Sequence, residues 1–254
     1  MADRRQLLKK GAVEFLIIVT GVLAALSVDE YRDAHRQAVI EREYLQRLVA
    51  DLDDAQTNLA RGLAWTKSRA RSGRAVLDHL AGVGHLTPTE VILASYEVNL
   101  VPASAERRLG RRTTYDELLS TGNLTTIHDS ALRDALAQYY EEYSRIGARL
   151  DDAPEGWRVW VRRLLPPDVL LEVDASSNPG TTSTPCLATS APEPGCGGPI
   201  PAEVQEAFTR QLRTDAAYAR GELNQLVQYQ DRQATDLEGF MEATATLRKR
   251  LDRP

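Results

Sequence analysis

Histidine is the side chain of this 254-residue sequence that most often holds a metal or moves a proton. The chain has four histidines, at His35, His79, His85 and His128. None has acidic or cysteine neighbours at the spacing of metal ligands. We expect His35 to be a surface residue. We expect His128, beside Asp129, to be a turn residue rather than a catalytic base.

Two groups of carboxylates could gather across a helical bundle and hold a cation. Asp51, Asp53 and Asp54 form one group, and Glu141 and Glu142 form the other. The Glu-x-x-His pairing of helix-bundle metal sites is missing from the sequence, so we favour solvated helix faces. A nucleophile elbow, a phosphate loop and a dinucleotide fingerprint are missing too. We therefore predict no catalytic, cofactor-binding or metal-binding residue, and we expect a protein that is not an enzyme.

A basic cluster occupies residues 105–112, AERRLGRR, at an expected helix junction. Its arginines are Arg107, Arg108, Arg111 and Arg112. We favour a solvated loop whose arginines pair with acidic helices. The alternative is a contact for an anionic ligand or a lipid headgroup, because clustered guanidinium groups bind anions.

Both cysteines, Cys186 and Cys196, fall in a long stretch rich in Pro, Gly, Ser and Thr, residues 168–201. Such a pair in an exported domain predicts a disulfide. Closing so short a loop would stabilise the fold by roughly 2–3 kcal/mol in the chain-entropy account. Two free thiols are the alternative. We expect the stretch to be a surface loop.

The stretch GAVEFLIIVTGVLAALSV, residues 11–28, decides where the rest of the chain lies. As a helix it would be roughly 27 Å long, close to the ~30 Å of a hydrocarbon core. We predict a transmembrane anchor helix. A signal peptide cleaved after Ser27 is the alternative, because Ala25 and Ser27 are small residues at the right spacing. The helical pattern continues past Ser27, which favours an uncleaved anchor.

Two features of this stretch could form contacts with lipid headgroups or with a partner helix. Glu14 is a charge within the apolar segment, and we expect it at headgroup level, paired with Lys10. A protonatable group or a contact for a partner helix is the alternative. A face of small residues, suited to helix packing in a membrane, is formed by Thr20, Gly21, Ala24 and Ala25.

Charges on either side of residues 11–28 predict the orientation. Four basic residues, Arg4, Arg5, Lys9 and Lys10, precede the stretch, and Asp29, Glu30 and Asp33 follow it. Basic residues favour the cytoplasmic side. We therefore expect residues 1–10 in the cytoplasm of a bacterium and residues 29–254 in the periplasm, with the anchor in the inner membrane.

Apolar residues recurring at three- and four-residue steps predict long helices over residues 29–80, 130–165 and 223–251. Shorter helices are expected over 90–100, from Thr113 or Thr114, and over 204–212. Pro154 and Gly156 are expected to kink the second long helix. Residues 169–173 could form a short strand or an extended arm.

The fold class predicted from these elements is all-α. We expect the N-terminal transmembrane helix to continue into an elongated antiparallel helical bundle, with one long Pro/Gly-rich loop over residues 168–201.

Two parts of the sequence resemble an uncharacterised family of bacterial single-pass membrane-anchored helical proteins, a domain of unknown function. The first part is EFLIIVTGVLAALSVDEY with EREYLQRLVADLDD, and the second is YDELLSTGNLTTIHDSALRDALAQYY. Residues on the family pattern are Glu14, Asp29, Gly122, Leu124, Asp129 and Leu132. Tyr31 stands where a tryptophan is expected. The resemblance implies an uncleaved anchor and a helical domain, and it implies no activity.

Three hypotheses for function remain. The first is a membrane-anchored interaction or scaffold protein, which binds a protein partner or a second copy through the anchor and the first long helix. The second is a ligand-sensing module that acts through a partner protein. The third, and least favoured, is a periplasmic enzyme with an unrecognised site. A formal net charge of −5, with 31 basic and 36 acidic residues, argues against nucleic acid as a partner.

Overall fold

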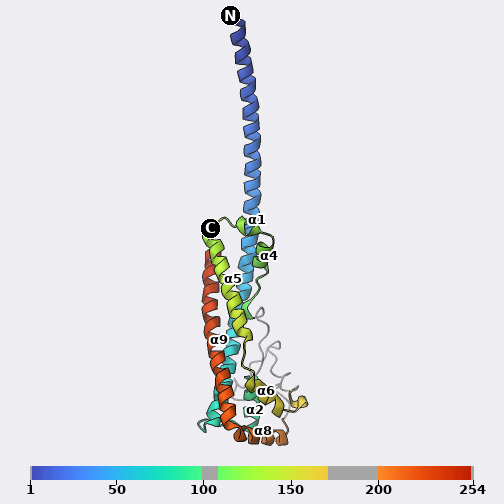
Figure 1. The fold of residues 1–254 in the computed structure, drawn as a ribbon, viewed down its shortest axis with the longest axis vertical. Coiled ribbons are helices and arrows are strands. Elements are labelled where there is room, and N and C mark those ends of the chain that lie inside the picture. The colour runs from blue at the N-terminus through green and yellow to red at the C-terminus, as the bar shows by residue number, and fades with distance from the viewer. Residues whose placement is uncertain (1, 99–107, 171–199, 253–254) are drawn as a thin grey trace. The chain divides into compact units, whose positions relative to one another are not determined.

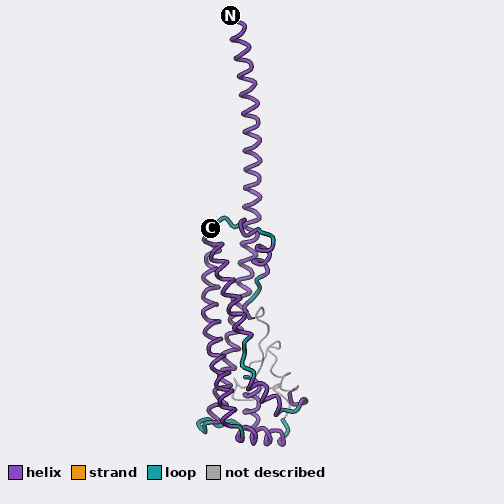
Figure 2. The backbone as a smooth tube through the Cα atoms, viewed as in Figure 1, coloured by secondary structure: helices purple, strands orange, loops and turns teal. Residues whose placement is uncertain are grey.

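The computed structural model describes residues 2–98, 108–170 and 200–252; inside its first helix, the side chains described are those of Thr20, Gly21 and residues from Glu30 onward. Every regular element of these residues is a helix (Figures 1 and 2). The elements are α1 (Ala2–Leu80), α2 (Pro88–Glu97), α4 (Thr113–Ser120), η1 (Asn123–Thr126), α5 (Ser130–Asp151), α6 (Gly156–Leu164), α8 (Ala202–Thr214) and α9 (Ala216–Leu251). The all-α prediction is therefore confirmed.

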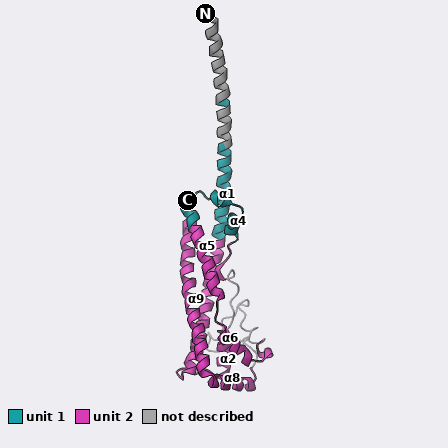
Figure 3. Ribbon diagram, viewed as in Figure 1, with its two compact units in different colours: residues 1–50, 113–134 teal, residues 51–112, 135–254 magenta. Residues whose placement is uncertain are grey.

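Two compact units divide the chain (Figure 3). Unit 1 contains residues 1–50 and 113–134, and unit 2 contains residues 51–112 and 135–254. Both boundaries fall inside helices, namely α1 and α5.

The first helix, α1, is one uninterrupted helix of 79 residues. It joins the predicted anchor segment to the helix predicted over 29–80, and it ends at the predicted residue. After it, Gly82 takes a φ of 75°, and the Val83 N–H donates to the Asp78 carbonyl over 3.0 Å. A glycine in the left-handed region commonly ends a helix in this way. His79 belongs to the same turn, because its Nδ1 accepts a hydrogen bond from the Leu86 N–H over 3.2 Å.

In unit 1, turn and cap residues define α4, η1 and the start of α5. Gly122 has a φ of 72°, and its N–H donates to the Leu119 carbonyl. Asp129 accepts a hydrogen bond from the Leu132 N–H over 3.1 Å, which is an N-cap contact. Gly122 therefore ends α4, and Asp129 caps α5.

In unit 2, α9 runs antiparallel to α1 and also to α5. Along α1, Gln56 donates to the carbonyl of Met241, whereas Arg74 further on pairs with Asp231. Along α5, Tyr139 bonds to Thr244, whereas Arg149 further on pairs with Asp236. As residue numbers rise along α1 and along α5, the numbers of their partners on α9 fall. In unit 2, α1 and α5 therefore run parallel to each other (Figure 1). The predicted antiparallel arrangement is correct for α9 and wrong for the pair α1 and α5.

The parallel pair arises because the chain runs back along α1 before α5 begins. Val98 lies against Arg69, whose Nη2 donates to its carbonyl over 2.7 Å. Further along, Gly110 lies against Ala55: a Cβ at Gly110 would be 2.5 Å from the Ala55 Cα. Between Val98 and Gly110, the point of contact on α1 therefore shifts from Arg69 to Ala55, which is about four helical turns toward the N-terminus of α1.

Several predicted elements differ from those of the structure. The helix predicted over 130–165 ends at Asp151, and α6 is a separate helix from Gly156. Pro154 therefore lies in a connection rather than at a kink. Val169 and Leu170 lie in a helical turn, so the strand or arm predicted from residue 169 is wrong there. The predicted helices over 204–212 and 223–251 extend to the bounds of α8 and α9, and the helix predicted over 90–100 is α2, capped by Thr87.

Large apolar side chains from α2, α6, α8, α9 and the end of α1 form the main core cluster of unit 2. Trp157 and Phe208 are fully buried in it, and Trp157 stacks on Trp160 with ring centroids 5.0 Å apart. The indole N–H of Trp160 donates to Asp215, between α8 and α9, over 3.0 Å. Each buried indole nitrogen thus has a partner, since that of Trp157 donates to the Ser95 carbonyl.

Some predictions concern residues that the structure does not describe. Cys186 and Cys196 lie outside the described residues, as does most of the loop predicted over 168–201. No described helix is long and apolar enough to span a membrane. The predicted anchor over 11–28 falls on residues whose side chains are not described, apart from Thr20 and Gly21.

Candidate functional site

The four arginines of the basic cluster have separate surroundings. Arg108 is 5% exposed and donates through Nη2 to the Leu150 carbonyl and to Asp151, each over 3.2 Å. Arg111 lies 3.7 Å from Asp54, and Arg112 donates to the hydroxyl of Ser144 over 2.9 Å. Arg107 lies outside the described residues. The structure thus gives the three described arginines protein partners, and an anion contact here stays a prediction.

Arg108 stabilises the carboxyl end of α5. The last carbonyls of a helix have no partner within the helix and carry a partial negative charge, which a cation offsets. Burial lowers the pKa of Arg108 from its usual value, while the nearby Asp151 opposes that change. Its Nε–H has no hydrogen-bond partner in the described part of the chain.

Two side chains of α9 bind the same end of α5. The Tyr229 hydroxyl lies 2.9 Å from the carbonyl oxygen of Leu150 and 3.2 Å from that of Arg149. Gln233 is 3% exposed, and its amide donates to the Tyr229 hydroxyl over 2.5 Å. Burial raises the pKa of the Tyr229 phenol, so the hydroxyl keeps its proton and can donate it at neutral pH. Together with Arg108, these groups bind the carbonyls of Arg149 and Leu150 in the last turn of α5.

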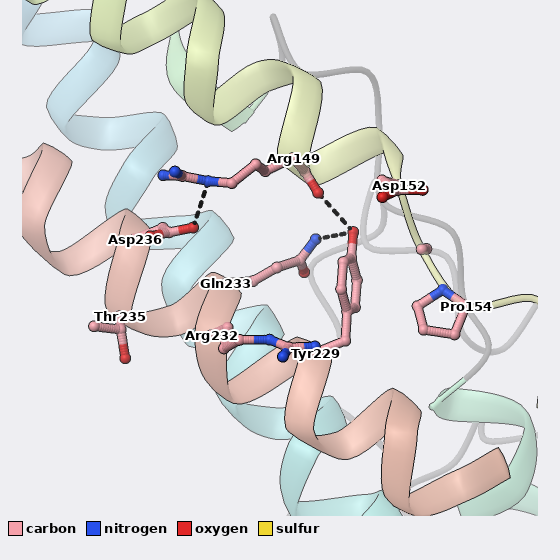
Figure 4. A pocket seen from close by; sticks show the side chains of 9 residues that line it. Arg149, Asp152, Pro154, Tyr229, Arg232, Gln233, Thr235 and Asp236 are labelled. Atoms are coloured by element: carbon pink, nitrogen blue, oxygen red, sulfur yellow. Dashed lines mark hydrogen bonds and ion pairs between the residues drawn. The ribbon is translucent and has the colours of Figure 1, made fainter.

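A surface pocket of about 680 Å³ lies beside these contacts (Figure 4). Its walls come from α9, the last turn of α5 and the connection that follows. The lining residues are Arg149, Asp152, Ala153, Pro154, Tyr229, Arg232, Gln233, Thr235 and Asp236. The lining therefore combines an aromatic ring, a proline and four charged side chains, a composition suited to binding a small polar molecule.

Two of the four charged side chains of the pocket form an ion pair with each other, and the other two do not. Arg149 pairs with Asp236 over 3.0 Å, as Figure 4 shows. Arg232 and Asp152 are exposed, and neither bonds to any other residue that the structure describes. One cation and one anion thus remain available at the pocket.

A second buried polar cluster joins α1 to the end of α2. Glu97 accepts hydrogen bonds from Ser68 over 3.0 Å and from Ser72 over 2.7 Å. Arg69 donates to the backbone carbonyls of Glu97 and Val98, over 3.3 and 2.7 Å. Burial lowers the pKa of Arg69 to about 9, against the opposing charge of Glu97.

Sequence reasoning missed both the pocket and this cluster. A usable signal was the run of Ser68, Arg69 and Ser72 on the packing face of α1, between the buried Thr66 and Val76. Polar residues at such positions indicate a buried hydrogen-bonded partner. Nothing in the sequence indicated that the partner would be Glu97.

The histidines and carboxylates considered above lie in separate places. The rings of His35 and Tyr31 stack with centroids 6.4 Å apart, and His128 bonds to Glu41 through its N–H and its ring over 2.8 and 2.7 Å. Asp53 pairs with Arg248, and Glu142 pairs with Arg145. Among the described residues, no three His, Cys, Asp or Glu side chains gather around a position for a metal ion.

The predicted membrane contacts remain untested. Thr20 and Gly21 are exposed, and a Cβ at Gly21 would meet no atom within 4 Å. Glu14, Ala24 and Ala25 belong to α1, but their side chains are not described.

Comparison with known proteins gives no match to a family model, to a curated protein or to a solved structure. The resemblance to a membrane-anchored family therefore stays a prediction from the sequence.

Proposed function

We propose that this protein is a membrane-anchored helical interaction protein of the bacterial periplasm. Residues 11–28 hold it in the inner membrane, with residues 1–10 in the cytoplasm. The apolar character of residues 11–28 and the basic residues that precede them support this proposal.

The observation that carries the proposal is the exposure of α1 just after the anchor. Every side chain from Glu30 to Ile40 is exposed, including three large apolar ones. Tyr31 is 74% exposed, Val39 47% and Ile40 44%. Among the described residues of unit 1, the hydrogen bonds that α1 makes with the segment 113–134 begin at Glu41, which binds His128, and continue with Tyr44 and Arg47, which bind Glu117.

Packing supplies most of the stability of a helix in a protein, and a short isolated helix is marginal in water. This segment lacks such packing against the residues that the structure describes, yet it displays apolar side chains. A partner helix would supply the missing contacts, with Tyr31, Val39 and Ile40 buried against it. We therefore place the docking surface on α1, residues 30–40.

Photo-crosslinking in intact cells tests this assignment. A photoreactive residue is placed at Tyr31 or Ile40 of the full-length chain, and a matched control carries it at Glu242, an exposed residue of α9. After irradiation, the chain is purified in detergent and its adducts are identified by mass spectrometry. We expect protein adducts at Tyr31 and Ile40 and none at Glu242.

The identity of the adduct then decides the kind of assembly. A reproducible adduct to another membrane protein supports a scaffold or accessory role. Adducts between copies of the chain support a homo-oligomer formed through the same surface. The absence of protein adducts at both positions would overturn the proposal.

A further inference from the structure

The pocket between α9 and the carboxyl end of α5 has a wall that is fixed before any ligand arrives. The Tyr229 ring forms this wall, and Figure 4 shows its hydroxyl held by the Arg149 carbonyl and the Gln233 amide. The Leu150 carbonyl also accepts a hydrogen bond from this hydroxyl. A side chain held in its binding position loses little entropy when a ligand binds. The ring therefore offers a preorganised apolar face.

The charges of the pocket indicate what the ligand must carry. Arg149 and Asp236 neutralise each other, and Asp236 has no other partner that competes with this pair in the described structure. Arg232, on α9, is left to bind an anion, and Asp152, beyond the end of α5, is left to bind a cation. The free carboxylate of Asp152 and the Tyr229 ring both line this pocket.

A ligand that matches these groups carries one positive and one negative charge on a short, partly apolar body. A volume of about 680 Å³ falls within the usual range of small-molecule sites, ~300–1,000 Å³. A guanidinium group binds a carboxylate well, because its N–H groups match the two carboxylate oxygens. The Asp152 carboxylate can accept hydrogen bonds, and an ammonium group would donate them.

We propose that this pocket binds a zwitterion of the amino-acid class, a free amino acid or a short peptide, with its carboxylate on Arg232 and its ammonium on Asp152. Its side chain lies against the Tyr229 ring and Pro154. The proposal goes beyond docking through α1, because it assigns a separate small-molecule site to α5 and α9.

Thermal unfolding and calorimetry with the full-length chain in detergent test the proposal. The probes are the free L-amino acids and a set of L-dipeptides, each added at millimolar concentration. A ligand that binds the folded state raises the Tm. We expect at least one probe to raise it, and we expect its N-acetylated and its amidated forms to bind about tenfold more weakly, since each lacks one ionic hydrogen bond.

Two variants assign the ends of the ligand. Arg232→Gln should lower the affinity for the zwitterion about tenfold, so that this variant binds the zwitterion no better than the amidated form. Asp152→Asn should lower the affinity by a similar factor, so that this variant binds the zwitterion no better than the N-acetylated form. Both residues are exposed and unpaired within the described structure, so the variants should fold normally. Arg250→Gln is the control, because Arg250 is also exposed and lies five helical turns away on the same face of α9.

The relative affinities of the probes show whether the pocket binds free amino acids or peptides. Tighter binding of free amino acids than of dipeptides assigns the site to amino acids, and the reverse order assigns it to peptides; either result supports the proposal. If no probe raises the Tm, or if Arg232→Gln and Asp152→Asn bind the zwitterion as the wild-type chain does, the proposal is wrong. Docking through α1 is judged separately by crosslinking.

Discussion

Gly110 shows how closely two backbones approach in unit 2. Its φ of 90° lies in the left-handed region, and a Cβ added there would be 2.5 Å from the Ala55 Cα and 2.9 Å from its N. Atoms this close to a backbone cannot move away at little cost. A side chain at position 110 would therefore meet both conformational strain and a clash.

We predict that Gly110→Ala destabilises the full-length chain by about 2 kcal/mol or more in urea unfolding. Gly239→Ala is the matched control. Gly239 lies inside α9, and a Cβ there would meet no atom within 4 Å. The control should gain about 0.5–1 kcal/mol, because alanine favours a helix over glycine. Equal effects of the two substitutions would contradict the close approach.

The residues of the pocket could not be chosen from the sequence. Arg232 and Asp152 are ordinary exposed charges in their own helices or connections, and 80 residues separate them. The hydroxyl of Tyr229 matters because it meets the carbonyls of Arg149 and Leu150, and that contact depends on where α5 ends. The apolar spacing predicts a helix that continues to residue 165, and a helix of that length would not bring these groups together.

At the scale of elements, a polar network attaches α4 to α1 in unit 1. Glu117 of α4 accepts hydrogen bonds from Tyr44 over 3.2 Å and from both terminal nitrogens of Arg47. The amide of Asn123, in η1, donates to the same tyrosine hydroxyl over 3.5 Å. The hydrogen bonds from Arg47 are the main cause of a Glu117 pKa below its usual value of 4.5.

This lowered pKa predicts the pH dependence of stability. Between the folded and unfolded pKa values the unfolded chain binds more protons, so this contribution to stability is present at neutral pH and is lost as the pH falls below about 4.5. We predict that wild-type chain is more stable than Glu117→Gln at pH 7 and that the difference narrows in acid. Unfolding free energies measured at several pH values would show this. A difference that stays constant, or a control Glu206→Gln that behaves in the same way, would contradict it.

Helix existence was easier to predict than helix connection. Regular apolar spacing predicted the long helices that the structure shows as α1 and α9. The directions of α1 and α5 could not be deduced, because both parallel and antiparallel packing bury the same apolar faces. The return of the chain along α1 depends on the close contact at Gly110 and on Arg69 holding the carbonyl of Val98.

At the scale of the whole molecule, the proposed anchor makes a prediction about the mature N-terminus. If residues 11–28 form an uncleaved anchor, the protein should stay with membranes after an alkaline carbonate wash. Mass spectrometry should find residues 1–27 still attached to the membrane-bound protein. A chain that begins at Val28 and is released by the wash would instead mean a cleaved signal peptide.

The pairing of α1 with α9 has a consequence for the time at which the protein can fold. Arg248 of α9 binds Asp53 of α1 across 195 residues of sequence. At a synthesis rate of ~5–20 residues per second, the last partner of α1 emerges roughly 10–40 s after Asp53. During that interval the residues of α1 that bind α9 in unit 2, such as Gln56 and Arg74, await a neighbour that has not yet been made. Newly made chains are therefore most vulnerable to proteases and to aggregation before α9 is complete, and premature termination within α9 should be far more damaging than its length suggests.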